Sequence, residues 1–155
     1  MWLHYDVMAN ILCQVSGTKR LLLYPPSDAK HFKLAPGASS SSIDPFTTKL
    51  GSRVHAHEVK LSPGDVLYIP PLWLHTAEPT GGMSVAVNVF FGDEEMQAGY
   101  AAGKDVYGNR DLAAYERGRR DVQRVGKSFE GLPDEVREFY ITRLAAELLT
   151  MAPST

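Results

Sequence analysis

The sequence predicts an α+β fold that is mainly β, with an antiparallel sheet followed by C-terminal helices. Between residues 7 and 91, short apolar runs that favour strands are separated by turns rich in glycine and proline. From about Asp93 onward, apolar residues instead recur at helical spacing. Strands that precede helices, rather than alternating with them, favour an antiparallel sheet with the helices grouped at one end.

The composition excludes several classes of protein. The chain has 155 residues, 44% of them hydrophobic, and 16 basic against 18 acidic residues give a formal charge of −2. No apolar run approaches the roughly 20 residues that span a bilayer, so no membrane partner is expected. The single cysteine, Cys13, excludes an intrachain disulfide framework and a cysteine-rich zinc site. A free thiol and the lack of a secretory signal predict an intracellular, cytoplasmic protein.

The first two predicted strands cover residues 7–15 and 19–24. Gly17 and Thr18 between them indicate a turn, so the pattern predicts a β-hairpin. Pro25 and Pro26 end the second strand, because proline cannot donate to the ladder. Ser27 is then the expected cap of a short helix over residues 28–31.

Three further strands are predicted after a long loop. Residues 35–52 are rich in proline, glycine, serine and threonine, which is the composition of a loop. Strands are then expected at residues 57–61, 66–69 and 84–91, and the middle one should be buried.

Two helical segments close the sequence. Residues 110–127 form the more polar one, and Pro133 with two acidic residues after it suits the start of the other. Beyond that start, an apolar stripe recurs every four residues and is expected to pack on the sheet or on a second copy; it consists of Val136, Tyr140, Leu144 and Leu148. The predicted division is a β core with the metal site over residues 1–92 and a helical region of the same domain over residues 93–155.

A candidate metal site consists of His4, Asp6 and the distant His75. On a strand, residues two apart point to the same face, so His4 and Asp6 can share a cavity. Two imidazoles and one carboxylate form the facial triad of non-haem Fe(II) oxygenases, which leaves coordination positions open. A His-x-Asp pair is also common in surface turns, so that interpretation stays open beside the functional one.

Three polar residues could accompany this triad. Lys19 offers a cation for the carboxylate of an acidic co-substrate. Asn10 has the same parity as His4 and Asp6, and Asn88 lies in an otherwise apolar strand, where an unpaired amide would cost stability. The alternative for Lys19 is a solvated residue of the hairpin. The alternative for Asn88 is a core amide whose hydrogen bonds are satisfied.

Three segments carry a resemblance to a known family. They are WLHYDVMANILCQVSGTKRLLLYPPSDAKHF, GDVLYIPPLWLHTAEP and SVAVNVFFG. Together they resemble the iron-binding core of the JmjC, cupin-like family of Fe(II)- and 2-oxoglutarate-dependent oxygenases. The more specific segments DVYGNRD, LPDEVREFY and LAPGASSSSIDPF are similar to the wybutosine-synthesising branch of that family.

That resemblance implies a double-stranded β-helix, or jelly roll, with its N-terminal strands missing. It implies an Fe(II) site and a 2-oxoglutarate site, made respectively of His4, Asp6 and His75 and of Lys19, Asn10 and Asn88. Family members carry strands before the His-x-Asp motif and a polar residue at the position of Met1. The chain is therefore expected to be a fragment of a longer protein.

The resemblance also implies an activity and partners. The activity is oxygenation in the biosynthesis of wybutosine, a hypermodified guanosine, with phenylalanine tRNA as partner and a homodimer formed through the C-terminal helices. Two alternatives stay open. One is the methoxycarbonyl-forming module of a fungal methyltransferase fusion, and the other is a JmjC protein hydroxylase or a non-catalytic cupin fragment.

Two further patterns have competing interpretations. His55 and His57 are spaced like strand metal ligands, but no carboxylate or cysteine pattern supports them, so solvated side chains are expected. Residues 104–127, which include the first helical segment, carry seven basic against four acidic residues, the basic ones being Lys104, Arg110, Arg117, Arg119, Arg120, Arg124 and Lys127. This excess could contact tRNA phosphates, or it could belong to a solvated helix with ion pairs such as Glu116–Arg120.

Overall fold

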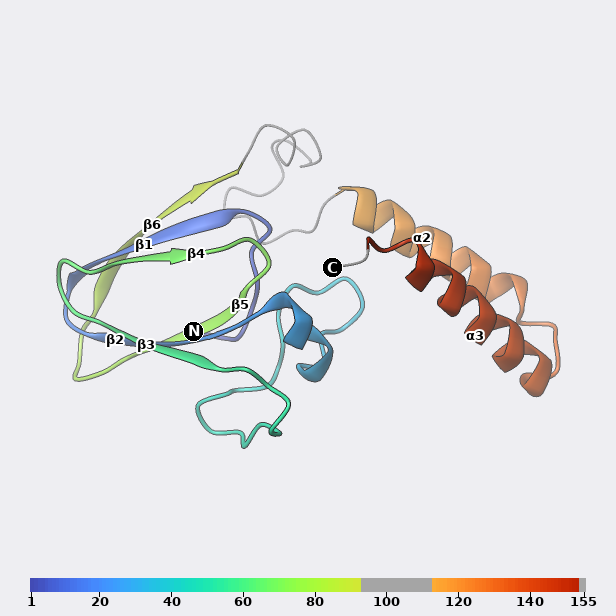
Figure 1. Ribbon diagram of the computed structural model, residues 1–155, viewed down its shortest axis with the longest axis horizontal. Coiled ribbons are helices and arrows are strands. Elements are labelled where there is room, and N and C mark those ends of the chain that lie inside the picture. The colour runs from blue at the N-terminus through green and yellow to red at the C-terminus, as the bar shows by residue number, and fades with distance from the viewer. Residues whose placement is uncertain (93–112, 154–155) are drawn as a thin grey trace. The chain divides into compact units, whose positions relative to one another are not determined.

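The computed structural model describes residues 1–92 and 113–153 (Figure 1). These residues fall into two compact units, Met1–Ala114 and Tyr115–Thr155. The first contains all the described strands and the second contains helices, so the predicted order of strands before helices is confirmed. The predicted boundary between residues 92 and 93 stays a prediction, because it adjoins residues outside the described part.

Two antiparallel three-stranded sheets make up the first unit (Figure 1). One sheet has the order β4-β1-β6, formed by Val66–Ile69, Ala9–Ser16 and Val85–Phe91. The other has the order β3-β2-β5, formed by His57–Leu61, Lys19–Tyr24 and Leu74–Pro79. The predicted antiparallel, mainly β architecture is therefore confirmed, and the predicted strands near 57–61, 66–69 and 84–91 are present.

The predicted hairpin between the first two strands is wrong. β1 pairs with β4 and β6, whereas β2 pairs with β3 and β5, so the two strands belong to different sheets. A bulge between Gln14 and Ser16 interrupts the β1 ladder, and the Gln14 Nε2 donates to the Ser16 and Gly17 carbonyls at 2.7 and 3.0 Å. Gly17 then turns the chain with a φ of +68°. A bulge and a left-handed glycine redirect a strand out of its sheet.

Two buried clusters lie on opposite sides of β2. The first, between the sheets, is built from Leu12, Leu21, Leu23, Leu61, Ile69 and Ala77. The second is built from Leu3, Leu22, Tyr24, Phe32 and Leu74. Successive side chains of a strand point to opposite faces, so β2 contributes leucines to both clusters. This burial of both faces explains why its sequence is continuously apolar rather than alternating.

The short helix after β2 differs slightly from the prediction. It is a 3₁₀ helix over Pro26–His31 with Pro25 at its N-cap, so Ser27 is inside it and not its cap. The carboxylate of Asp28 instead accepts hydrogen bonds from the backbone N–H of His55 at 2.6 Å and from the His55 Nδ1 at 3.1 Å. These contacts attach the loop before β3 to the helix.

β4 is not the buried strand that was expected. Val66 and Tyr68 are more than half exposed, and only Ile69 is fully buried. On β6, Val87 and Val89 are also exposed, and Cys13 of β1 is half-buried opposite Val66 and Val87. The β4-β1-β6 sheet therefore buries one face and leaves apolar side chains on the other.

The described helices of the second unit are α2 (Ala113–Ser128), whose first two residues precede the boundary between the units, and α3 (Asp134–Thr150). Pro133 occupies the N-cap of α3, as its position in the sequence predicts. In α2, Glu116 lies 3.6 Å from Arg119 and 4.0 Å from Arg120, so the predicted pair with Arg120 is present. None of the described helices is long and apolar enough to cross a membrane.

Candidate metal centre

The segment Met1–His4 runs antiparallel to β5. The backbone N–H of His4 donates to the His75 carbonyl at 3.1 Å, and the N–H of His75 donates to the His4 carbonyl at 2.7 Å. The N-terminal ammonium donates to the Ala77 carbonyl at 2.9 Å, and the Thr76 hydroxyl donates to the Met1 carbonyl at 2.5 Å. His4 also bridges to Ser40 on its other side. β5 therefore gains a partner beyond β2.

β5 itself was not predicted, because its sequence LHTAEP lacks an apolar alternation. The expected strand through His4 and Asp6 is also not formed as a regular strand. His4 forms only isolated bridges, and Asp6 precedes a bend at residues 7–8 that leads into β1. The backbone carbonyl of Asp6 accepts from Leu72, whose φ is +65°. Asp6 is thus placed by a contact with the turn before β5.

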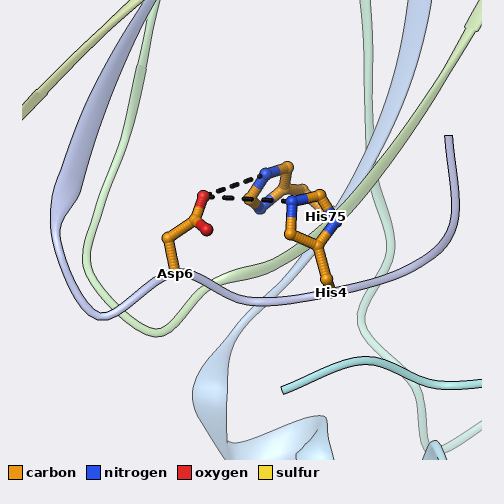
Figure 2. A group of neighbouring side chains, drawn as sticks. All are labelled: His4, Asp6 and His75. Carbon is orange, nitrogen blue, oxygen red and sulfur yellow. Dashed lines mark ion pairs between the residues drawn. The ribbon is translucent and has the colours of Figure 1, made fainter. Parts of the chain in front are cut away.

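Three side chains converge at this junction, as Figure 2 shows. His4 and His75 direct their Nε2 atoms at the same oxygen of Asp6, at 4.0 and 3.6 Å from Oδ2. One ligand atom from each of the three residues lies within 4.8 Å of the others, which forms the metal-capable cluster found among the described residues. Asp6 and His75 are about 4% exposed. The predicted His4–Asp6–His75 grouping is therefore present in space.

The second nitrogen of each ring fixes its tautomer. The Nδ1 of His4 lies 3.0 Å from the Trp2 carbonyl, and the Nδ1 of His75 lies 3.0 Å from the Trp73 carbonyl. Because a carbonyl oxygen can only accept, each Nδ1 must carry the hydrogen. A neutral ring then presents a bare lone pair at Nε2 toward Asp6, which is the form that binds a metal.

Burial reinforces this state at His75. Burial, with a smaller effect from the nearby His4 ring, lowers the pKa of His75 from its ordinary value to about 4, although its bond to the Trp73 carbonyl acts in the opposite direction. The ring is neutral at pH 7. The two imidazole rings lie 4.3 Å apart and are tilted by 52°. Two imidazole nitrogens and one carboxylate suit a divalent first-row cation.

The same tripeptide, Trp-Leu-His, supplies both histidines. Its two copies, residues 2–4 and 73–75, meet at the antiparallel pair of His4 and His75. Leu3 and Leu74 are both fully buried in the second apolar cluster. In both copies, the histidine ring hydrogen-bonds to the backbone carbonyl two positions before it.

A cavity of about 580 Å³ extends from the cluster between the two sheets. It is lined from both sheets and from the Met1–His4 segment, by Met1, Trp2, His4, Asp6, Asn10, Leu12, Lys19, Leu21, Ile69, His75, Ala77, Ala86, Asn88 and Phe90. All six residues predicted for the metal and co-substrate sites are therefore in one cavity. Lys19 reaches it from the opposite sheet to Asn10, not from a hairpin partner.

The three predicted co-substrate residues have different surroundings. Asn10 is 1% exposed, and its Oδ1 has no hydrogen-bond partner among the described residues. Lys19 is half-buried, whereas Asn88 is exposed and is not the satisfied core amide of the alternative interpretation. His55 and His57 are exposed and outside the cavity, as expected.

Sequence reasoning missed two aromatic residues of the lining, Trp2 and Phe90. A signal was available for both. Trp2 lies an even number of positions from His4 and Asp6, and Phe90 lies two positions from Asn88 on β6. In an extended chain, such spacing puts side chains on the same face.

Comparisons with known proteins show the family to which the chain belongs. Residues 1–97 match the family described as Cupin-like domain. The chain is 61% identical over 157 residues to tRNA wybutosine-synthesizing protein 4 of Neurospora crassa, covering 96% of this chain and 13% of that protein. It is 37% identical over 161 residues to tRNA wybutosine-synthesizing protein 5 of Homo sapiens, covering 99% of this chain and 49% of that protein.

A solved structure is also similar. It is the ribosomal oxygenase YcfD from Escherichia coli in complex with cobalt and 2-oxoglutarate, with a TM-score of 0.37 and 17% identity, covering 84% of this chain and 36% of that chain.

Proposed function

Because this chain belongs to the cupin-like domain family, we propose that it is an Fe(II)- and 2-oxoglutarate-dependent oxygenase domain acting on tRNA in wybutosine biosynthesis. The observation that carries the proposal is the convergence of His4, Asp6 and His75 on one point at the end of a cavity. The names of the relatives support the choice of substrate and pathway. The chain spans 13% and 49% of those relatives, so their whole activities come to it only as a proposal.

In this proposal the two histidines and Asp6 hold Fe(II). Bound iron would supply the activation of molecular oxygen, coupled to oxidative decarboxylation of 2-oxoglutarate. The protein supplies three ligands on one side and leaves the cavity side open. The carbonyls of Trp2 and Trp73 keep both rings oriented, and Asp6 and His75 are buried.

Lys19 is proposed to bind the carboxylate of 2-oxoglutarate that lies away from the metal. It pairs with Pro79, four positions along β5 from His75, which is roughly 13 Å of strand. A long lysine side chain that lines the cavity can reach back along it toward a dicarboxylate. The buried, unpartnered Oδ1 of Asn10 and the amide of Asn88 offer polar contacts between these two ends.

The tRNA partner has support from α2. Arg117, Arg120, Arg124 and Lys127 are exposed along this helix, where they could contact phosphates. Two of these cations, Arg120 and Arg124, also pair with acidic neighbours, as the alternative interpretation expects. Lys104, Arg110 and the segment DVYGNRD lie outside the described residues. The specific choice of phenylalanine tRNA, the homodimer and the cytoplasmic location stay predictions.

The proposal is tested by anaerobic titration of the purified chain with Fe(II) and 2-oxoglutarate, following the visible charge-transfer absorption of the chelate. We expect the band in the wild type and in the control His55→Ala, which changes an exposed histidine outside the cavity. Asp6→Ala should lose it. A wild type without the band, or an Asp6→Ala variant that retains it, would contradict the proposal. No observation on the described residues favours the methoxycarbonyl-forming module, the JmjC protein hydroxylase or the non-catalytic cupin fragment.

A further inference from the structure

The long loop between the 3₁₀ helix and β3 pairs with the backbone on both sides of His4. The N–H of Tyr5 donates to the Ser39 carbonyl at 3.0 Å, and the N–H of Ser41 donates to the Leu3 carbonyl at 2.9 Å. β5 pairs with the same short segment along its opposite edge. The segment that carries His4 therefore lies between β5 and the loop.

Ser41 attaches this part of the loop to the core. Of the four serines at residues 39–42, Ser41 is the buried one, with 6% of its surface exposed. Its hydroxyl donates to the Phe32 carbonyl and accepts from the N–H of Ile43 at 3.0 Å. Phe32 is fully buried in the second apolar cluster, so the hydroxyl joins the loop to a fixed point. Removing such a hydroxyl leaves buried backbone groups without their partner.

Separate contacts hold the rest of the loop. The apolar side chains of its later part that pack against the second apolar cluster are Phe46, Leu50 and Val54. The guanidinium of Arg20 also lies over the ring of Phe46, 5.1 Å from its centroid. Loss of the Ser41 hydroxyl should therefore loosen residues 39–41 without unfolding the loop as a whole.

Resting on the proposed function, we propose that Ser41 is a positioning residue of the metal centre, which fixes the loop segment that pairs with the backbone beside His4. A binding site needs its side chains held to within about 0.5 Å by supporting contacts. When residues 39–41 leave the His4 segment, β5 alone holds it. The ring of His4 then gains conformational freedom that a metal must remove on binding.

This arrangement couples the loop to the metal in both directions. If pairing of the loop raises the affinity for a cation by some factor, the bound cation must favour the pairing by the same factor. The serine-rich segment is thereby part of the metal centre, although none of its side chains lines the cavity.

Calorimetric titration with Co(II) measures the first direction. Ser41→Ala should weaken binding about tenfold, within the usual range for coupled sites. Ser41→Thr keeps the hydroxyl and should recover most of the affinity. Ser42→Ala changes the exposed serine next to it and should bind as the wild type does. The ligand-field absorption of bound Co(II) should change in Ser41→Ala and return in Ser41→Thr.

Gly64→Ala separates positioning from a general loss of stability. Gly64 has a φ of +96°, so alanine there strains the fold without touching residues 39–41. Under conditions in which every variant is folded, it should keep the Co(II) affinity of the wild type. Equal weakening in Gly64→Ala and Ser41→Ala would overturn the positioning role.

Amide hydrogen exchange in the wild type measures the second direction without any substitution. With saturating Zn(II), which is diamagnetic, exchange at the N–H groups of Tyr5 and Ser41 should slow about tenfold, because both close the pairing. The N–H of Thr48, which donates to the Asp44 carbonyl within the same loop at 2.9 Å, should slow less.

The outcomes separate this inference from the proposed function. Wild-type affinity of Ser41→Ala for Co(II), or equal slowing at Tyr5, Ser41 and Thr48, would overturn the role of Ser41 while the wild type still binds metal. A wild-type chain that binds neither Co(II) nor Zn(II) would instead remove the proposed function itself.

Discussion

At the scale of single residues, each histidine of the cluster directs one ring nitrogen at a backbone carbonyl and the other at Asp6. The grouping of His4, Asp6 and His75 could be predicted from the sequence, because His-x-Asp and a distant histidine are a recognisable set. The tautomers could not, since they depend on the Trp2 and Trp73 carbonyls facing the two rings. Lys19 and Asn10 were also placed correctly in the cavity, although the reason given for Lys19, a hairpin, is wrong.

Lys19 should govern affinity for the co-substrate. Lys19→Ala removes a charge-assisted hydrogen bond, so binding of 2-oxoglutarate should weaken tenfold or more. Lys19→Arg should retain part of the affinity. Titration of the Fe(II) complex measures this, with Lys60→Ala as the control because Lys60 is exposed on β3 outside the cavity. Equal losses in Lys19→Ala and Lys60→Ala would remove the assigned role.

Asp28 should stabilise the fold in a pH-dependent way. Burial alone would raise the pKa of Asp28, but the backbone and side-chain hydrogen bonds from His55, together with the charges of His55 and His31, lower it below its ordinary value. A depressed folded pKa means that the unfolded chain binds the proton more readily. The stabilisation is therefore fully present above the ordinary carboxyl pKa of 3.8 and is lost as the pH falls through the folded value.

Urea unfolding of the wild type and Asp28→Ala at several pH values measures this effect. The substitution should cost about 1 to 3 kcal/mol at pH 7, because the His55 N–H loses a buried acceptor. The difference should shrink below about pH 4. Asp28→Asn serves as the control that keeps an acceptor without the charge. A difference that grows toward low pH would contradict the assignment.

At the scale of elements, sequence patterns located most strands but not their partners. Alternation and turn residues act locally, so they found β3 and β6 within a residue of their bounds. Strand pairing depends on the direction that the chain takes after a bulge and a left-handed glycine. Gly17 and Thr18 after β1 suggested a hairpin, but that hairpin does not form. β5 was not predicted from the sequence, because its burial comes from β2 and from the distant Met1–His4 segment. The sequence LHTAEP does not indicate these contacts.

Gly17 should be the least replaceable of three exposed or half-exposed glycines. A Cβ at Gly17 would lie 2.2 Å from the Met83 carbonyl oxygen, and the φ of +68° is strained for other residues. Gly64 has a φ of +96° but open space, and Gly51 has open space without a positive φ. Gly64→Ala should therefore cost about 1 to 2 kcal/mol, Gly17→Ala clearly more, and Gly51→Ala almost nothing.

Denaturant midpoints of the three glycine variants test this order. The close approach of the Met83 carbonyl predicts that the turn at Gly17 cannot accept a side chain. A Gly17→Ala variant as stable as Gly51→Ala would contradict this prediction.

At the scale of the whole molecule, metal binding should stabilise the unit that contains the sheets. A cation that binds the folded state alone adds stability by mass action, about 2.7 kcal/mol at one hundred times its dissociation constant. Thermal unfolding should therefore shift upward with Co(II) and return after chelation. Asp6→Ala should not respond, whereas His55→Ala should respond as the wild type does. An unchanged melting temperature at saturating Co(II) would contradict a site built into the folded sheets.

The pairing of the Met1–His4 segment with β5 also sets an order of events during synthesis. Met1 and Ala77 are hydrogen-bonded across 76 positions of sequence. At translation rates of about 5 to 20 residues per second, roughly 4 to 15 s separate the emergence of these partners from the ribosome. Until β5 emerges, the nascent chain presents His4 and Asp6 without the third member of the cluster, and Leu3 has no Leu74 to pack against. Loading of the complete site must therefore follow the synthesis of β5.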